Sequence, residues 1–233
     1  MKTTQYPTVG ELVAQRPARS KVFEKLGIDY CCGGKKELDA ACAELGLDIG
    51  TVERELEQCD KTAPAGKDWT QAPLAELCDH IEGTHHKYLR EELPALSVLS
   101  EKVASVHGAN HPELVEIARI YAGLRAELEQ HMMKEEQILF PFIRQLSQSG
   151  GCGDFHCGSV ANPIRVMEQE HDNAGNAIHE IRRLSSQFTV PDGGCNSYRA
   201  LYQRLDAFEH DLHQHVHKEN NILFPRAIKA EAH

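Results

Sequence analysis

A chain of 233 residues, 41% hydrophobic, 26% charged and 6% aromatic, has room for one main domain and a small accessory domain, and its composition favours a soluble helical protein. The formal charge of −10 argues against nucleic acid and anionic membranes as partners, and no apolar run reaches the length of a membrane span. The first residues resemble no signal peptide and the eight cysteines are irregularly spaced, so we expect a cytoplasmic protein with reduced thiols.

The first part of the chain, residues 1–60, predicts a small domain of short helices. Thr8 and Glu11 have the spacing of a capping box, which typically begins a helix. Gly27 and Gly46 stand where helices typically end. Short helices are marginal alone, so we expect them to pack on one another or on the rest of the protein.

A segment with linker composition, residues 61–68, separates this domain from the remainder, residues 69–233. The remainder predicts four long helices, over residues 73–106, 113–147, 163–188 and 197–229. Only short breaks join them, and short connections place neighbouring helices antiparallel. The expected fold is therefore all-α: an antiparallel up-down-up-down four-helix bundle preceded by a small helical domain.

Histidine and glutamate interrupt the apolar stripes of these helices. The stripe of the second helix consists of Leu124, Leu128, His131, Glu135, Ile138 and Phe142, and that of the fourth consists of Leu205, Phe208, Leu212, His215, Glu219 and Ile222. The third helix places His171 in the same way. Each of these polar residues occupies a position that would normally carry a hydrophobic side chain.

An internal repeat relates the two halves of the bundle. The second helix contains His131-Met-Met-Lys-Glu-Glu-Gln-Ile-Leu-Phe-Pro141 and the fourth contains His215-Val-His-Lys-Glu-Asn-Asn-Ile-Leu-Phe-Pro225. Each is preceded by a helix with a lone histidine, so the bundle resembles a duplicated hairpin. At about 1.5 Å of rise per residue, the lone histidines and the His-x-x-x-Glu pairs reach the same height.

Four buried imidazoles and two buried carboxylates would be costly unless they were paired or bound to metal. Residues four apart share a helix face, so each His-x-x-x-Glu pair can offer a nitrogen to one ion and a carboxylate that bridges to a second. Mixed nitrogen and oxygen ligation suits iron, with manganese or zinc as lesser alternatives. Glu127 and Asp211, four residues before the two pair histidines, are expected to be outer carboxylates.

Two alternatives remain open from the residues alone. Glu-x-x-His spacings also occur, and a carboxylate-rich site of the ferritin-like type would use Glu82, His85, Glu135, Glu168, His171 and Glu219. In the first helix the stripe through Ile81 favours His85 as the inward histidine, whereas Leu89 and Leu93 favour His86.

Several long motifs resemble those of the hemerythrin-like iron-sulfur cluster repair proteins, the RIC or ScdA family. They are Asp29-Tyr-Cys-Cys-Gly-Gly-Lys35, Ala72-Pro-Leu-Ala-Glu76, Asp79-His-Ile81, the two repeat motifs, and Val166-Met-Glu-x-Glu-His-Asp172. The resemblance covers nearly the whole chain. It implies that the metal ligands are His86, His131, Glu135, His171, His215 and Glu219, and that Glu127 and Glu170 line a route to the metal.

The resemblance also implies a function. The expected protein holds two non-haem iron ions with oxo and carboxylate bridges, forms a homodimer, and repairs iron-sulfur clusters damaged by nitric oxide or peroxide by donating iron to damaged iron-sulfur proteins. The alternatives are an enzyme that reduces nitric oxide or nitrite, and a hemerythrin-type binder or sensor of dioxygen or nitric oxide. Cys31 and Cys32 are expected to act in thiol chemistry or iron transfer, the alternative being an inert turn. Cys152, His156 and Cys157 are read as part of a plain glycine-rich connection or as an extra metal or thiol site.

Overall fold

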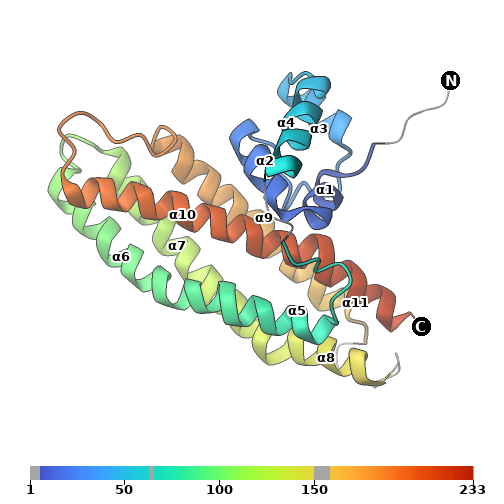
Figure 1. Ribbon diagram of the computed structural model, residues 1–233. Coiled ribbons are helices and arrows are strands. Elements are labelled where there is room, and N and C mark those ends of the chain that lie inside the picture. The colour runs from blue at the N-terminus through green and yellow to red at the C-terminus, as the bar shows by residue number, and fades with distance from the viewer. Residues whose placement is uncertain (1–5, 63–65, 150–157, 233) are drawn as a thin grey trace.

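The structure is a computed structural model that describes residues 6–62, 66–149 and 158–232 (Figure 1). Within these ranges the regular elements are helices, and β-type pairing is limited to an isolated bridge between Thr8 and Glu37. The predicted all-α fold is therefore confirmed. None of the described helices is both long enough and apolar enough to cross a bilayer.

Four long helical rods lie side by side and form a bundle (Figure 1). The first rod comprises α5 (Leu74–Ile81), η2 (Glu82–His86) and α6 (Lys87–His107); the second, α7 (Glu113–Lys134), η3 (Glu135–Leu139) and α8 (Phe140–Ser149); the third, α9 (Ala161–Leu184); and the fourth, α10 (Asn196–Lys218), η4 (Glu219–Leu223) and α11 (Phe224–Glu231). The helix α6 contacts α7 and α10, and α9 contacts the same two helices. Each rod thus packs on two others, which gives the helical bundle expected from the sequence.

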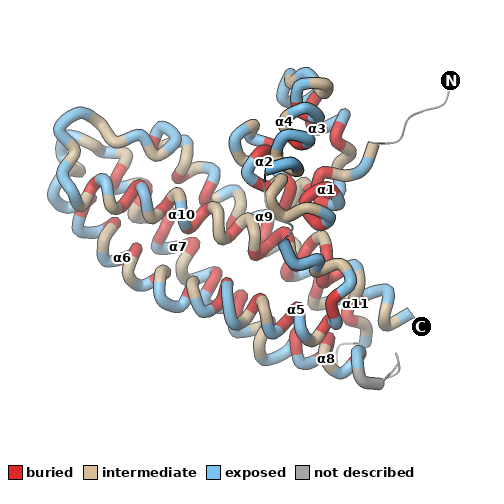
Figure 2. The backbone as a smooth tube through the Cα atoms, in the orientation of Figure 1, coloured by how far each residue is buried: buried red, intermediate tan, exposed pale blue. Residues whose placement is uncertain are grey.

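The bundle core consists of two apolar clusters. The cluster toward the α6–α7 and α9–α10 connections includes Leu89, Leu128 and Leu212, and the cluster toward the opposite end includes Ile81 and Leu139. Figure 2 shows buried positions concentrated on the inner faces of the rods. Buried histidine and glutamate side chains form a polar layer between the two clusters.

Three rods contain a π-helical turn at this polar layer, namely η2, η3 and η4. A π turn inserts one extra residue and shifts the following side chains by one position around the helix. In the second rod Ile138 is therefore 56% exposed and Leu139 is buried, so the prediction that Ile138 belongs to the core stripe is wrong. In the first rod the turn buries both His85 and His86, which explains why the stripes on either side of it favoured different histidines.

The third rod ends at Leu184, four residues before the predicted end at residue 188. Residues 186–188 have positive φ angles of 50°, 60° and 57°, which an α-helix cannot contain. The Ser185 hydroxyl accepts the backbone N–H of Phe188 at 3.0 Å and stabilises this turn. Serine can hydrogen-bond locally to the backbone, and this competes with helix continuation.

The small domain contains α1 (Val9–Gln15), η1 (Pro17–Arg19), α2 (Ser20–Leu26), α3 (Leu38–Leu45) and α4 (Ile49–Thr62), which enclose an apolar cluster of their own. The capping box of Thr8 and Glu11 is formed, and Gly27 and Gly46 end α2 and α3 with positive φ angles of 71° and 66°. The helix α4 continues to Thr62, two residues into the segment expected to be a linker.

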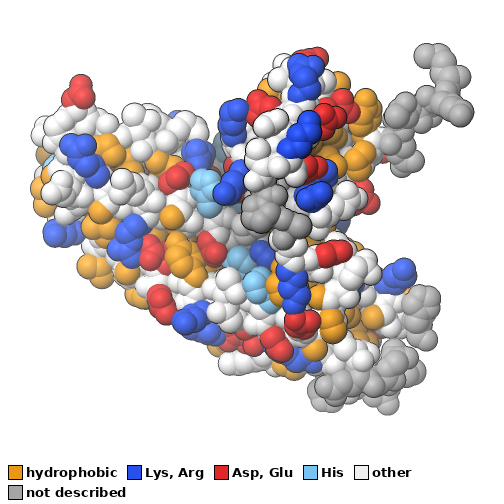
Figure 3. All heavy atoms as spheres, viewed as in Figure 1, with side chains coloured by type: hydrophobic (Ala, Val, Ile, Leu, Met, Phe, Trp, Pro, Cys, Tyr) orange, Lys and Arg blue, Asp and Glu red, His pale blue; other side chains and the backbone are white. Residues whose placement is uncertain are grey.

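The small domain lies against the bundle through a polar network around Tyr30. The buried Tyr30 hydroxyl donates to Glu24 Oε1 at 2.7 Å and accepts from Gln214 Nε2 at 3.0 Å. Its ring packs edge-on against His217 of α10, and Glu24 pairs with His210 Nε2 at 3.2 Å. Figure 3 shows histidine side chains on the surface of the bundle beside the small domain. Aromatic and charged contacts therefore fix where the segment after α2 meets the bundle.

Candidate functional site

Six side chains in the polar layer are at most 2% exposed and face one another across the bundle axis. They are His86, His131, Glu135, His171, His215 and Glu219. The π turns η3 and η4 begin at the two glutamates, and η2 ends at His86. These turns present a histidine or glutamate to the core in a rod whose neighbouring turns carry apolar side chains.

The four imidazoles form two pairs, each made by two different rods. His86 Nε2 lies 3.2 Å from His215 Nε2, and His131 Nε2 lies 3.0 Å from His171 Nε2. Each pair therefore offers two nitrogens to one point in the core. The lone histidine of one hairpin meets the repeat histidine of the other hairpin in the first pair, and the same holds for the second.

Each glutamate is shared by the two imidazole pairs. Glu135 Oε2 lies 3.3 Å from both His86 Nε2 and His131 Nε2. Glu219 Oε1 lies 3.0 Å from His215 Nε2, and its Oε2 lies 3.1 Å from His171 Nε2. The ligand atoms of each pair and of both carboxylates lie within 4.8 Å of one another, so two ions could be held with the carboxylates between them.

The donor set fits metal better than it fits hydrogen bonding. Within the described part of the chain, both carboxylate oxygens of Glu135 and the Oε2 of Glu219 are buried without a hydrogen-bond partner. Burial works to lower the pKa of His131, but the charges of Glu135 and Glu219 outweigh it and raise the pKa to about 9. Opposite charges thus stabilise this layer when it is metal-free, and cations between nitrogen and oxygen donors would replace the protons. These buried groups fit a di-iron centre.

Three of the imidazoles are oriented by a second hydrogen bond. The bonds run from His86 Nδ1 to Glu136 Oε1 (2.7 Å), from His131 Nδ1 to Glu170 Oε2 (2.9 Å) and from His171 Nδ1 to Asn220 Oδ1 (2.8 Å). Such acceptors fix the ring orientation and direct Nε2 toward the metal position. Sequence reasoning missed Glu136 and Asn220, although each directly follows a repeat glutamate, and this shared position was the available signal.

Within the described residues, the two expected outer carboxylates form no hydrogen bond with the histidines four residues after them. Glu127 is exposed on α7, and His131 Nδ1 bonds to Glu170. Asp211 Oδ1 accepts from His85 Nδ1 at 2.9 Å, and neither Asp211 Oδ2 nor His215 Nδ1 has a hydrogen-bond partner in the described ranges. Glu127 lies beside the exposed Ala126 on the solvent-facing side of α7, whereas Leu124 and Leu128 face the core.

The residues of the carboxylate-rich alternative do not converge. Glu82 pairs with Arg144 at 3.0 Å and Glu168 pairs with Lys35 at 2.8 Å, both on the bundle surface. His85 is buried but is turned toward a different group of polar side chains on α10. The described geometry therefore groups His86 with the other five residues of the histidine-rich set.

Cys31 and Cys32 lie in the segment between α2 and α3, where it meets the bundle. Their sulfur atoms are 4.0 Å apart, and Cys31 is 7% exposed. The Asn221 amide of η4 donates to the Cys31 carbonyl at 2.9 Å. A β-carbon at Gly34 would overlap this amide, so glycine permits the close approach. The sequence-predicted residues Cys152, His156 and Cys157 lie outside the described residues.

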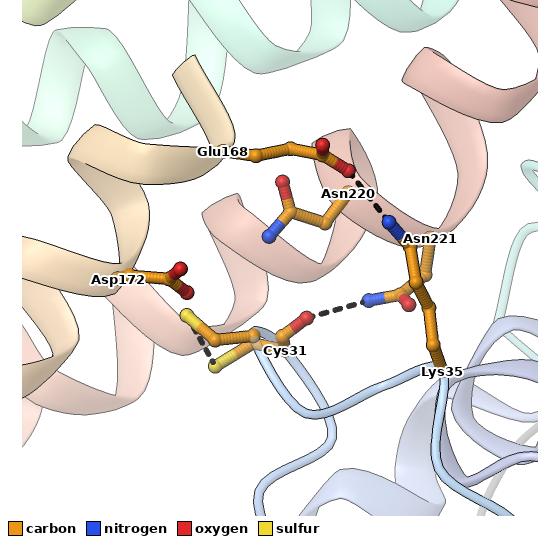
Figure 4. A pocket seen from close by; sticks show the side chains of 7 residues that line it. Cys31, Lys35, Glu168, Asp172, Asn220 and Asn221 are labelled. Carbon is orange, nitrogen blue, oxygen red and sulfur yellow. Dashed lines mark hydrogen bonds and ion pairs between the residues drawn. The ribbon is translucent and has the colours of Figure 1, made fainter. Parts of the chain in front are cut away.

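A cavity of about 130 Å³ opens beside the two sulfur atoms (Figure 4). Asp172 of α9 and Asn220 of η4 line it from the bundle, and the ion pair of Lys35 and Glu168 spans its edge. Asn220 is the acceptor for His171, so this cavity lies one hydrogen-bonded side chain from the imidazole pair of His131 and His171.

Comparisons with known proteins cover both parts of the chain. Residues 79–227 match the family described as "Hemerythrin HHE cation binding domain", and residues 5–60 match the ScdA_N family, described as "Domain of Unknown function (DUF542)". The chain is 40% identical to the iron-sulfur cluster repair protein YtfE of Pectobacterium carotovorum over 96% of this chain and 97% of that protein. The proteins of the same name from Citrobacter koseri and Yersinia pseudotuberculosis are 42% and 39% identical over the same shares.

Proposed function

The chain belongs to the hemerythrin-like iron-sulfur cluster repair family, and we propose that it is a di-iron protein that repairs iron-sulfur clusters damaged by nitrosative or oxidative stress, by donating iron. The observation that carries the di-iron part is the sharing of Glu135 and Glu219 between two buried imidazole pairs. The repair function rests on the named relatives, which match the chain over nearly its full length.

The proposed ligands divide into two sets. His86 and His215 would hold one ion and His131 and His171 the other, and each set would share the carboxylates of Glu135 and Glu219. Bound iron supplies redox states and open coordination positions for a small ligand.

The residues around the polar layer exclude water from it and orient its imidazoles. The apolar clusters on both sides exclude water from the charged groups. Glu136, Glu170 and Asn220 hold three imidazoles with Nε2 facing inward. Glu170 also pairs with Lys134, so an iron ligand is connected through one carboxylate to a half-exposed cation. We propose Glu170 as a residue of the route to the metal, whereas Glu127 keeps this role only by family resemblance.

Cys31 and Cys32 are proposed to act in iron transfer. Their position beside Asn220, next to the imidazole pair of His131 and His171, supports this role. Nitric oxide or dioxygen as small ligands, a homodimeric state and a cytoplasmic location are proposed on the family resemblance.

The test compares two activities of the purified iron-loaded protein. Iron transfer to an apo iron-sulfur acceptor is measured alongside nitric oxide consumption under turnover with a reductant. We expect reconstitution of the acceptor that depends on the iron content of the protein. Nitric oxide consumption without any acceptor reconstitution would instead establish a reductase.

A further inference from the structure

The segment between α2 and α3 gathers donors that the di-iron centre does not use. The Asp29 carboxylate accepts the backbone N–H groups of Cys31, Cys32 and Gly33 at 2.8 to 3.0 Å. This turn holds the two adjacent thiols on one side, with Cys31 Sγ 3.2 Å from Asp29 Oδ1. Two sulfur atoms and a carboxylate thus meet in a fixed arrangement at the junction of the small domain and the bundle.

The spacing of these donors suits one metal ion. The ligand atoms of Asp29, Cys31 and Cys32 all lie within 4.8 Å of one another, and the two sulfur atoms are 4.0 Å apart. Two thiolates at about 2.3 Å from a tetrahedral ion are separated by about 3.8 Å, so little movement is required. A mixed thiolate and carboxylate set favours a transition metal over calcium or magnesium.

The electrostatics of the segment favour a cation. Lys35, the lysine that lines the cavity, is paired with Glu168. The carboxylates of Asp29 and Asp172 supply negative charge that a divalent ion would compensate, and the adjacent cavity gives the ion room.

A further donor comes from the bundle. Asp172 of α9 lines the same cavity as the two sulfur atoms (Figure 4). Cys32 Sγ lies against α9, at 3.6 Å from where a β-carbon of Gly175 would stand, so the thiols face the helix that carries Asp172. The donors therefore come from both parts of the chain, and an ion between them would be held at the domain junction.

We propose that Asp29, Cys31, Cys32 and Asp172 form a second metal site, which binds one divalent transition-metal ion such as Fe²⁺ and is separate from the di-iron centre. Binding converts two thiols to thiolates and releases two protons to solvent, with no change in the oxidation state of the metal. This site deepens the proposed function, because an ion released from the pair of His131 and His171 would reach it past Asn220.

The test is a cobalt titration of the full-length iron-loaded protein under anaerobic, thiol-reducing conditions. Histidine and glutamate ligands give no sulfur-to-cobalt charge-transfer absorption, so this near-ultraviolet band reports thiolate ligation alone. We expect the band to saturate at about one cobalt per chain. It should be lost in Cys31→Ser/Cys32→Ser, with di-iron content unchanged. Asp172→Asn, which leaves the turn of Asp29 intact, should weaken cobalt binding by about tenfold or more.

The matched control is Cys59→Ser/Cys195→Ser, which removes two thiols outside the proposed site and should keep the band. Absence of the band in the unmodified protein, or its persistence in Cys31→Ser/Cys32→Ser, would overturn the proposed site. Cluster repair is measured on the same samples to separate the two proposals. If the protein shows the band but repairs no cluster, the second metal site stands and the proposed function is refuted. If it repairs clusters but shows no band, the proposed function stands and the second metal site is refuted.

Discussion

Removing one histidine should affect one iron, whereas removing one glutamate should affect both. In His131→Ala the ion shared with His171 loses one of its two imidazoles, while the pair of His86 and His215 is untouched. Removal of an outer hydrogen-bond acceptor typically weakens metal binding by 10 to 100 times, so loss of a ligand should cost at least about 100-fold, or about 2.8 kcal/mol, at that ion. Iron content should fall from about two to about one per chain.

Glu135→Ala should have a broader effect than either histidine variant. Glu135 Oε2 lies 3.3 Å from one imidazole of each pair, so both ions lose a ligand. We expect iron content well below one per chain after the same purification. Iron is measured by elemental analysis on protein expressed in iron-replete medium, and helical content by circular dichroism shows that each variant is folded.

Glu82→Gln and Glu168→Gln provide the control. Both carboxylates form surface ion pairs, with Arg144 and Lys35, and such pairs contribute about 0–1 kcal/mol. These variants should retain two irons. Full iron content in His131→Ala together with iron loss in the two glutamine variants would refute the histidine-rich ligand set and restore the carboxylate-rich one.

Removal of iron with a chelator should leave the helices formed but lower the unfolding temperature, because iron at 100 times its dissociation constant contributes about 2.7 kcal/mol; calorimetry with and without iron measures this. The hydrogen bond to Glu24 raises the pKa of His210 to about 9 from its ordinary 6.5. The stabilisation by this pair should therefore be complete below pH 6.5 and lost as the pH rises through 9. The measurement is the difference in the free energy of unfolding between the protein and His210→Gln as a function of pH. In Gly34→Ala the new β-carbon would overlap the side-chain amide of Asn221 in η4. This variant should lower the free energy of unfolding, measured in urea, by about 1–3 kcal/mol without changing iron content. Glu170→Gln should weaken iron binding by about 10–100-fold in a chelator competition, whereas Glu127→Gln should leave it unchanged, since only Glu170 contacts a histidine ligand.

The sequence by itself was sufficient for the helical bundle and for most of its polar layer. The repeat of His131 and Glu135 in His215 and Glu219, at positions where an amphipathic helix is apolar, indicated buried polar side chains at one height. Burial of charge in a core requires compensation, so these residue types already pointed to metal. The stripe through His171 was also correct, because α9 is an α-helix throughout.

Tertiary structure alone decided the register at each π turn and the partners around the site. A π turn adds one residue without a change in composition, so sequence periodicity could neither place Leu139 inside and Ile138 outside nor choose between His85 and His86. The contact between Asn220 and His171 joins rods that are far apart in sequence, and a spacing rule along one helix cannot predict it. Local spacing determines which side chains share a helix face, whereas the packing of different rods determines which of those side chains meet.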